Sequence, residues 1–468
     1  MKKKELNITE GPLLGSMLRY AVPVILTSLL QLLYNSADMF VVGNFCDDPN
    51  AIGAIGCTGA MINLILGLFF GLGAGVCVVL ARSIGSGDEA KIVRTVHTSI
   101  TLSIIMGVVV GVIGYVLTPT VLGWMNTGDE FIVGATAYMR IYFLGSVGNL
   151  LYNFCVGMLR SRGDTMNPLI FAAIGGFVNI VLNLVFVIAF DMGVSGVAWA
   201  TIISQYISAA LSVIHMMRLK DACRLDLRRL GIDWRTTLDF MRIGIPAGLQ
   251  GMMFSLSNVV LQSGYNSLSP VHVNANSAAS QVDGYLYNIL NAFYHTTLTF
   301  ASQNYGARKP KRLKKVFITA VGCVTVIGIT VGSLIYTFSD TLVGIFDSDP
   351  AVLAVAKYRL LLVALPYFLC GLMEVGSAML RSIGYSFTST VISFFGSCLF
   401  RIVWVLTVFN ANKDVTVLYM VYPLSWTVTF TTLVIAYVIL YRKKVRTLLG
   451  MPEEVASLDK ENAPCYTE

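Results

Sequence analysis

The sequence predicts an all-α integral membrane protein with twelve transmembrane helices in two six-helix lobes. Hydrophobic residues make up 55% of the 468 residues and charged residues only 13%, whereas a soluble domain carries about 25% charged residues. Apolar segments that reach the roughly 20 residues needed to span a bilayer recur twelve times. The hexapeptide Met-Leu-Arg-Ser-Arg-Gly at Met158 returns as Met-Leu-Arg-Ser-Ile-Gly at Met379, 221 residues later. One six-helix unit therefore occurs twice, as is common in secondary transporters.

The apolar segments divide the chain into two equal sets. The first six span residues 16–44, 51–81, 93–118, 130–160, 166–190 and 194–217. The second six span residues 238–267, 272–304, 316–338, 352–380, 386–410 and 415–441. We therefore expect an N-lobe (1–217), a cytoplasmic linker (218–237), a C-lobe (238–442) and a disordered cytoplasmic tail (443–468).

The duplication extends beyond the hexapeptide. The segment that ends at Pro23 aligns with the segment that ends at Pro246, which places a proline inside the first helix of each half. Arg82-Ser-Ile-Gly aligns with Gln303-Asn-Tyr-Gly after the second helix of each half. Because six helices return the chain to its starting side, both copies enter the membrane in the same direction. The two lobes are thus expected to be related by a pseudo-two-fold axis along the membrane normal.

Lysine and arginine are concentrated in alternate loops, which fixes the expected orientation. Basic residues crowd the start, the second, fourth and eighth loops, the central linker and the end, whereas the other loops are acidic or neutral. The positive-inside rule then places both termini in the cytoplasm of a multi-pass plasma-membrane protein. Charges in short loops do not form a nucleic-acid-binding face, so no nucleic-acid partner is expected despite the net charge of +7.

Motifs for chemical catalysis are missing from the sequence. There is no Gly-Lys-Ser/Thr nucleotide loop, zinc motif, nucleophile elbow or Cys-x-x-Cys pair. The chain is therefore predicted not to be an enzyme. Any energy for transport comes from an ion gradient, unless transport is passive.

A cluster of oxygen-bearing side chains is predicted at one depth of the N-lobe. Asp38 lies inside the first helix, and Tyr34 precedes it by one helical turn on the same face. Asn179 and Asn183 share a face of the fifth helix, and Thr201 lies at similar depth on the sixth. Such ligands suit Na⁺, and a buried carboxyl also carries a proton. The alternative is structural: a protonated Asp38 and two asparagines that hydrogen-bond neighbouring helices.

The C-lobe carries different charges inside its helices. Leu261 stands where the first-helix alignment would place Asp38. Glu374 corresponds to Asn153 in the repeat, and Arg401 lies in the middle of the eleventh segment. Ionisable residues inside spans are functional candidates. Glu374 and Arg401 either pair with each other or line a substrate cavity.

Other residues are weaker candidates. Met253 would be part of an adaptable apolar cavity wall, and His295 would either line the cavity or serve as a hydrogen-bonded packing residue. Arg140 and Arg359 lie nearer the outer helix ends and are interpreted as structural anchors. We include Asn153, Met253 and His295 with Glu374 and Arg401 as substrate-cavity candidates.

At these residues the chain resembles the multidrug and toxic compound extrusion (MATE) family, in its DinF/MepA-like branch. The resemblance rests on the pattern Gln31-x-x-Tyr34-Asn35-x-x-Asp38 with Gly43, on the paired hexapeptides, and on Asn179 to Asn183 followed by Met192-Gly-Val-x-Gly-Val-Ala and Thr201. It implies a V-shaped central cavity that opens alternately to each side. It also implies export of organic, often cationic, amphiphiles in exchange for Na⁺ or H⁺, with no other cofactor.

The resemblance further implies a cation site at Tyr34, Asp38, Asn179 and Thr201. The family's second carboxylate in this lobe falls at Asn183, which is a departure and leaves Asp38 as the only acid of the N-lobe cluster. A bound Na⁺ would have Asp38, Asn179, Asn183 and Thr201 as ligands. The identity of the coupling ion stays open.

Three functions follow, in decreasing order of support. The first is a cation-coupled antiporter for multidrug efflux, with Asp38 as the coupling carboxyl, small drug-like molecules as substrates and the lipid bilayer around a monomer. The second is a flippase for lipid-linked precursors, which would need a more cationic cavity than Arg401 alone provides. The third is a passive membrane scaffold or channel.

Overall fold

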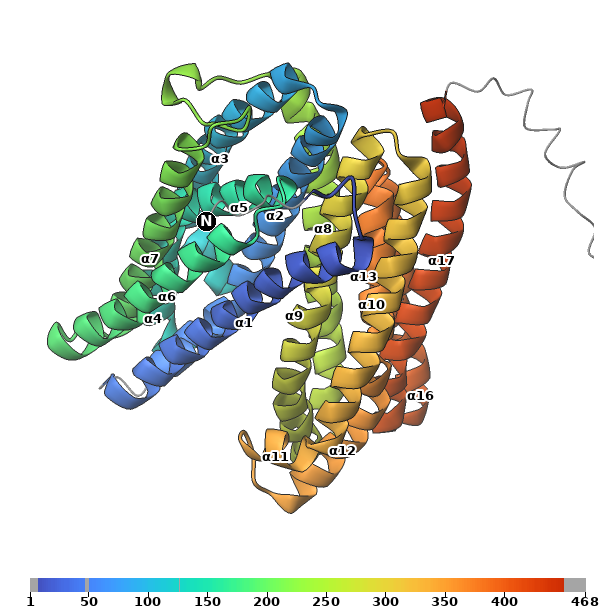
Figure 1. Cartoon of the computed structure of the whole chain (residues 1–468). Helices are drawn as coiled ribbons and strands as arrows, with labels where there is room; N and C mark the ends of the chain where they lie inside the picture. Colours follow the sequence, from blue (N-terminus) through green and yellow to red (C-terminus); the bar gives the residue numbers. More distant parts are fainter. Residues whose placement is uncertain (1–6, 47–49, 126, 450–468) are drawn as a thin grey trace, which may run out of the picture.

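The computed structural model describes residues 7–46, 50–125 and 127–449, and helices account for nearly all of them. Figure 1 shows two groups of long helices, one formed by α1 to α7 and the other by α8 to α17. The described residues contain no β-strand. The predicted disordered tail lies, apart from 443–449, outside the described residues; α17 continues to Leu449.

The first half contains seven α-helices. They are α1 (Leu13–Phe45), α2 (Ala51–Ser86), α3 (Glu89–Trp124), α4 (Asp129–Leu144), α5 (Ser146–Ser161), α6 (Met166–Leu184) with the π-helical η1 (Val185–Ala189), and α7 (Gly193–Met217). A connection with the short 3₁₀ turn η2 (Leu227–Arg229) leads into the second half.

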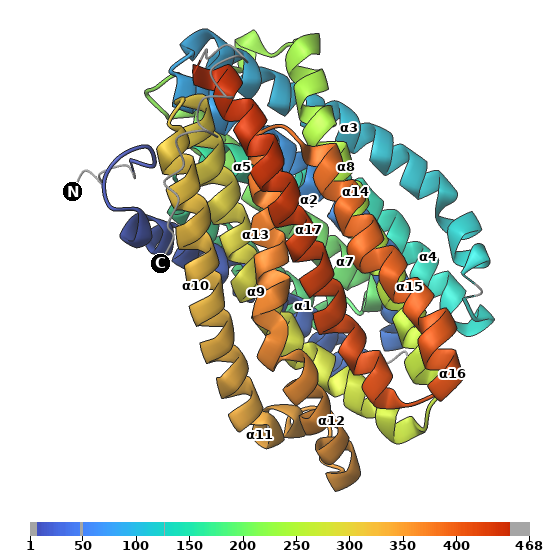
Figure 2. The same cartoon turned by 90° about the vertical axis from the view of Figure 1, so that its right-hand side faces the viewer.

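The second half repeats this order with more interruptions. It contains α8 (Trp234–Asn266), α9 (Pro270–Gly306), α10 (Pro310–Thr337), α11 (Ser339–Gly344), α12 (Pro350–Val363), η3 (Leu365–Tyr367), α13 (Phe368–Ser382), α14 (Ser386–Ser393), η4 (Phe394–Leu399), α15 (Phe400–Trp404), η5 (Val405–Phe409), α16 (Asn410–Asn412) and α17 (Val415–Leu449). Figure 2 views this half face-on, with α10, α17 and α14 in front.

Twelve spans account for these helices. Ten helical stretches are long and apolar enough to cross a membrane, and α4 and α5 together form an eleventh that is bent by 49°. Gly145 lies at this bend, where a side chain would collide with Ile202. The twelfth is α9, which has 37 residues but many polar ones along its length. α9 packs against α1, α2, α10, α12 and α13, and the polar residues of its last turns are buried inside the protein: Thr296, Thr297, Thr299, Ser302, Gln303 and Asn304.

Glycine allows the two halves to approach closely along α2 and α8. Gly67, Gly71 and Gly75 are spaced four residues apart on α2 and therefore lie on one face. A Cβ atom at Gly75 would lie 2.7 Å from the carbonyl oxygen of Phe240, and one at Gly71 would overlap the backbone of Gly248. This small-residue stripe brings two helix backbones into contact without intervening side chains.

Two reciprocal contacts join the halves near the repeated hexapeptides. Arg82 Nε donates to the carbonyl oxygen of Ser382 at 3.1 Å, and Gln303 Nε2 donates to the carbonyl oxygen of Ser161 at 2.6 Å. The repeat alignment pairs Arg82 with Gln303 and Ser161 with Ser382. Each half thus holds the hexapeptide of the other half by an equivalent bond.

The halves are in contact at one end and diverge toward the other. In Figure 1 they approach each other near the end that carries the connection between α7 and α8 and the end of α17. They separate toward the end that carries α11 and α16. This arrangement is the V shape expected for two lobes on a pseudo-two-fold axis.

Candidate functional site

The first half contains a cavity of about 550 Å³ that is lined by residues of α1, α2, α4, α5, α6 and α7, with Asn288 of α9 added from the second half. Asp38 is the one charged residue among the described residues that line it. Most other polar groups in the lining are amides and hydroxyls, including those of Asn35, Asn63 and Gln205. A single carboxylate among neutral dipoles is suited to bind one small cation.

Asp38 lies within a chain of hydrogen bonds that starts on α6. Asn183 donates from Nδ2 to the Asp38 carboxylate, and the same Nδ2 lies 3.3 Å from Asn179 Oδ1. Asn179 Nδ2 in turn lies 3.5 Å from Thr201 Oγ1. The i, i+4 spacing on α6 places both amides on the face that meets α1 and α7. Four of the five residues predicted for the cation cluster are therefore brought together.

Tyr34, the fifth predicted residue, lines the same cavity but does not hydrogen-bond to Asp38. Its hydroxyl donates to the carbonyl oxygen of Ala173 at 3.4 Å. The ring packs directly against Gly176, where any side chain would overlap it. Tyr34 therefore forms part of the cavity wall one helical turn from the carboxylate.

The oxygen atoms around Asp38 fit a cation. Asn183 Oδ1 is buried and accepts no hydrogen bond from the described residues. Leaving a buried acceptor unsatisfied costs about 1–3 kcal/mol. Because Asn183 Nδ2 faces the carboxylate, a cation bound by both Asp38 and Asn183 Oδ1 would require the Asn183 amide to rotate, while the Asn179 carbonyl and the Thr201 hydroxyl belong to the same chain of contacts. The donor set is made of oxygens only, as hard cations prefer.

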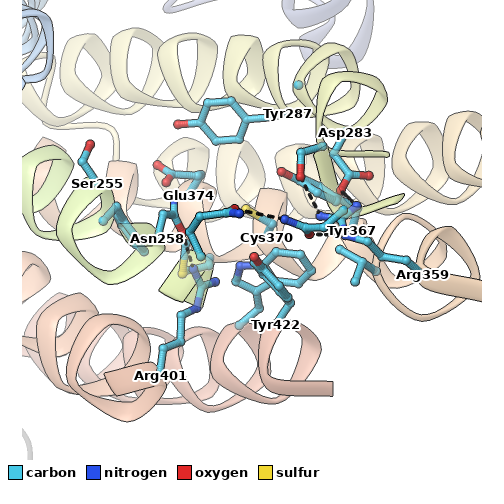
Figure 3. Close-up of a pocket in the computed structure, with 18 of the residues that line it drawn as sticks. Ser255, Asn258, Asp283, Tyr287, Arg359, Tyr367, Cys370, Glu374, Arg401 and Tyr422 are labelled. Atoms are coloured by element: carbon cyan, nitrogen blue, oxygen red, sulfur yellow. Dashed lines mark hydrogen bonds and ion pairs between the residues drawn. The ribbon is translucent and has the colours of Figure 1, made fainter. Parts of the chain in front are cut away.

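The second half encloses a cavity of about 530 Å³ with a different charge pattern, shown in Figure 3. Arg359 and Asp283 form a buried ion pair at 2.6 Å on its wall. The remaining donors of Arg359 are directed at Asn276 Oδ1 at 2.9 Å and Ser280 Oγ at 3.2 Å. This guanidinium is thus neutralised and held by three residues of α9.

Glu374 and Arg401 line the same cavity but form no ion pair with each other. Arg401 donates from Nε to Ser425 Oγ at 3.1 Å and from Nη1 to Asn258 Oδ1 at 3.4 Å. Of the two arrangements that the sequence left open, the structure shows the second, in which both charges line a cavity.

The remaining predicted residues are dispersed. Asn153 lines the N-lobe cavity and donates to Asn149 Oδ1 at 2.7 Å. Met253 and His295 line neither of the two cavities. Arg140 lies over the ring of Tyr115, outside both cavities.

Asp283 was not identified from the sequence, although it partners Arg359. It is a carboxylate inside the predicted 272–304 span, and it lies on the same helix face as Asn276 and Ser280. The criterion that selected Asp38, an ionisable residue within a span, would also have selected Asp283.

Comparison with known proteins decides the family. The MatE family model matches residues 23–185 and matches again at residues 246–407. The chain belongs to the MATE family. The two matches also repeat the duplication seen in the hexapeptides. Membership of a transporter family confirms the prediction that the chain is not an enzyme.

Two curated relatives of this MATE chain come from Bacillus subtilis and Staphylococcus aureus. It is 27% identical over 387 residues to the probable multidrug resistance protein YoeA of Bacillus subtilis, covering 81% of this chain and 83% of YoeA. It is 23% identical to the multidrug export protein MepA of Staphylococcus aureus, covering 88% and 90% of the two chains.

The fold of the MATE chain matches solved structures. An outward-facing multidrug resistance MATE transporter of the MOP superfamily superposes with a TM-score of 0.87 at 20% identity, covering 96% of this chain and 100% of the other. The predicted architecture of two six-helix lobes is therefore confirmed.

Proposed function

We propose that this MATE protein is a secondary antiporter that exports drug-like organic molecules in exchange for Na⁺ or H⁺. The observation that carries the proposal is the Asp38 carboxylate, which lines a cavity, has no cationic partner among the described residues and accepts a hydrogen bond from the Asn183 amide. Relatives are named multidrug resistance and multidrug export proteins, which supports the same substrate class.

In this proposal the two cavities bind different ligands. A cation that binds at Asp38 neutralises its charge and changes its hydrogen bond with Asn183, which moves α1 relative to α6. The organic substrate occupies the cavity that contains Glu374 and Arg401. Cation entry from one side then favours substrate release to that side, because the two occupied states prefer different lobe arrangements.

The lobes move as units in this mechanism. We propose an N-lobe at residues 1–217 and a C-lobe at residues 238–442, joined by the linker at residues 218–237. The reciprocal bonds of Arg82 and Gln303 hold the lobes together at the linker end and break when the opposite side closes. The protein is placed in the plasma membrane as a monomer with both termini in the cytoplasm.

A flippase for lipid-linked precursors is supported less well. Pyrophosphate groups are bound by clusters of cationic side chains. In the C-lobe cavity the charge of Arg359 is neutralised by Asp283, so Arg401 is the remaining arginine of the lining without a carboxylate partner among the described residues.

The direct test uses purified protein in proteoliposomes with Na⁺ and pH gradients imposed separately. We expect the wild type to accumulate the permanent organic cation ethidium under at least one gradient. Asp38→Asn should abolish this accumulation because the amide neither titrates nor attracts a cation.

Two further results complete the test. The matched variant Asn153→Asp moves the carboxyl within the same cavity, and it should not restore transport to Asp38→Asn. Wild-type transport that is indifferent to both gradients would contradict antiport. Full gradient-driven accumulation by Asp38→Asn would contradict the role of Asp38.

A further inference from the structure

Arg401 is a buried guanidinium that forms no ion pair with any carboxylate of the described residues. Its side chain lies on α15 and is only 4% exposed. Three aromatic rings surround it: Tyr422 at 4.8 Å, Trp426 at 5.9 Å and Phe254 at 6.0 Å from the ring centroid. These rings stabilise the cation by the attraction of their negative faces. The rings also fix the orientation of the guanidinium, whereas the side chain of a solvated arginine has no fixed orientation.

The hydrogen bonds of Arg401 leave part of the guanidinium available. Nε and Nη1 donate to Ser425 and Asn258, which are both uncharged. No described residue accepts a hydrogen bond from Nη2, although arginine offers five N–H groups in a planar fork. Since Arg401 lines the cavity, the free side of this fork is accessible to a ligand.

Glu374 presents the opposite charge to the same cavity. It lies on α13, is 8% exposed, and neither accepts a hydrogen bond nor forms an ion pair with any described residue. Figure 3 shows Glu374 and Arg401 extending from different helices. The other charged side chains of the lining, Arg359 and Asp283, neutralise each other. The lining is thus neutral in sum and holds one charge of each sign that no other lining residue pairs with; Arg381, two turns further along α13, interacts electrostatically with Glu374 from outside the lining.

Irregular helix geometry supports a ligand role for this region. Arg401 belongs to a five-residue α-helical turn, Phe400–Trp404, that is flanked by the π-helical segments Phe394–Leu399 and Val405–Phe409. π-Helical insertions occur mostly as single turns and are frequent at functional sites. The equivalent helix of the first half contains one such segment, Val185–Ala189. The segment that precedes Arg401 is an addition of the C-lobe.

We propose that the C-lobe cavity binds amphoteric substrates, with an anionic group such as a carboxylate on Arg401 and a cationic group beside Glu374. A ligand with only a positive charge would leave the guanidinium unpaired, and one with only a negative charge would leave Glu374 unpaired. Burying an unpaired charge is costly, so a molecule that satisfies both is favoured. The carboxylate would receive charge-assisted hydrogen bonds from the guanidinium fork. The inference rests on the proposed export function and specifies its substrate class.

The test compares two dyes that differ in one charge. Rhodamine B carries a carboxylate and a delocalised cation, whereas its ethyl ester carries the cation alone. Binding of both is measured by fluorescence anisotropy with the full-length protein in lipid nanodiscs, with empty nanodiscs as the blank. We expect the wild type to bind rhodamine B more tightly than the ester. Arg401→Gln should weaken rhodamine B binding by about tenfold or more and leave the ester within about twofold.

Three variants complete the design. Arg401→Lys retains the charge and should preserve part of the preference for rhodamine B. Glu374→Gln should weaken both dyes by a similar factor because both carry the cation. Arg140→Gln removes an arginine that lies over an aromatic ring outside the cavity, and it should change neither dye.

Certain outcomes would overturn the inference. They are an equal loss of both dyes in Arg401→Gln, or a wild type that does not prefer rhodamine B, including one that binds neither dye. Gradient-driven transport of the ester by Arg401→Gln separates the proposed export function from the proposed recognition of amphoteric substrates. If it persists while the dye preference is missing, export stands and amphoteric recognition fails.

Discussion

The two cavities have similar volumes, about 550 Å³ and 530 Å³, but the charged side chains that line them differ. The N-lobe cavity places one carboxylate, Asp38, among neutral amides and hydroxyls. The C-lobe cavity is lined by two carboxylates and two guanidinium groups. Asp283 and Arg359 neutralise each other in an ion pair, whereas Glu374 and Arg401 do not pair. The repeat pairs Asn153 with Glu374, and each lines the cavity of its own lobe.

This difference shows what each half retained after duplication. The shared elements are structural: a proline in the first helix, Pro23 and Pro246, and the reciprocal bonds of Arg82 and Gln303. The charged side chains in the cavities are not shared. In the proposed mechanism, the frame that is common to both lobes supports symmetric rocking, and the different charges assign the cation to one lobe and the organic molecule to the other.

Removal of a single carboxyl should distinguish the cavities most strongly. Asp283→Asn leaves the buried Arg359 without its counter-charge, which costs about 3–5 kcal/mol in comparable pairs. Asp38→Asn removes a carboxylate that has no cationic partner in the part of the chain that the structure describes, so its effect on stability should stay below about 1 kcal/mol. Thermal unfolding of both variants in the same detergent, followed by tryptophan fluorescence, measures the contrast. Equal losses would show that the N-lobe carboxylate is also part of an ion pair.

A smaller contrast is expected from one added methyl group in each cavity wall. Gly176→Ala would push against the Tyr34 ring and should destabilise the protein by about 1–3 kcal/mol. Gly284→Ala, in the wall of the C-lobe cavity, meets nothing within 4 Å. Because alanine favours a helix over glycine by about 0.5–1 kcal/mol, this control should be neutral or stabilising. Thermal unfolding checks both variants, and a neutral Gly176→Ala would mean that Tyr34 is free to move.

The spans and the cluster around Asp38 could be predicted because both depend on local sequence. Counting the apolar segments that are long enough to span a bilayer gives the number of spans, and the i, i+4 spacing of Asn179 and Asn183 shows that their side chains share a helix face. The span at 272–304 was predicted from its length and apolar content, although the many polar residues of α9 keep its mean hydropathy below that of the other spans.

The arrangement of the C-lobe charges could not be predicted in this way. Whether Arg359 meets Asp283, or Arg401 meets Glu374, depends on how α9, α12, α13 and α15 are rotated about their axes, which no local pattern determines. The bend between α4 and α5 and the π-helical segments on both sides of Arg401 also follow from tertiary packing. These irregularities set the position and direction of the side chains in the cavities.

The central claim is that the N-lobe binds the coupling cation and the C-lobe binds the substrate. Its most direct test is the cation dependence of ethidium affinity in the wild type, Asp38→Asn and Glu374→Gln, titrated separately with Na⁺ and with acid. Antiport requires that the cation weaken substrate binding, by about fivefold or more for a typical coupling energy. We predict this dependence in the wild type and in Glu374→Gln, and a constant affinity in Asp38→Asn. A full cation dependence in Asp38→Asn, or its loss in Glu374→Gln alone, would contradict the division of labour between the lobes.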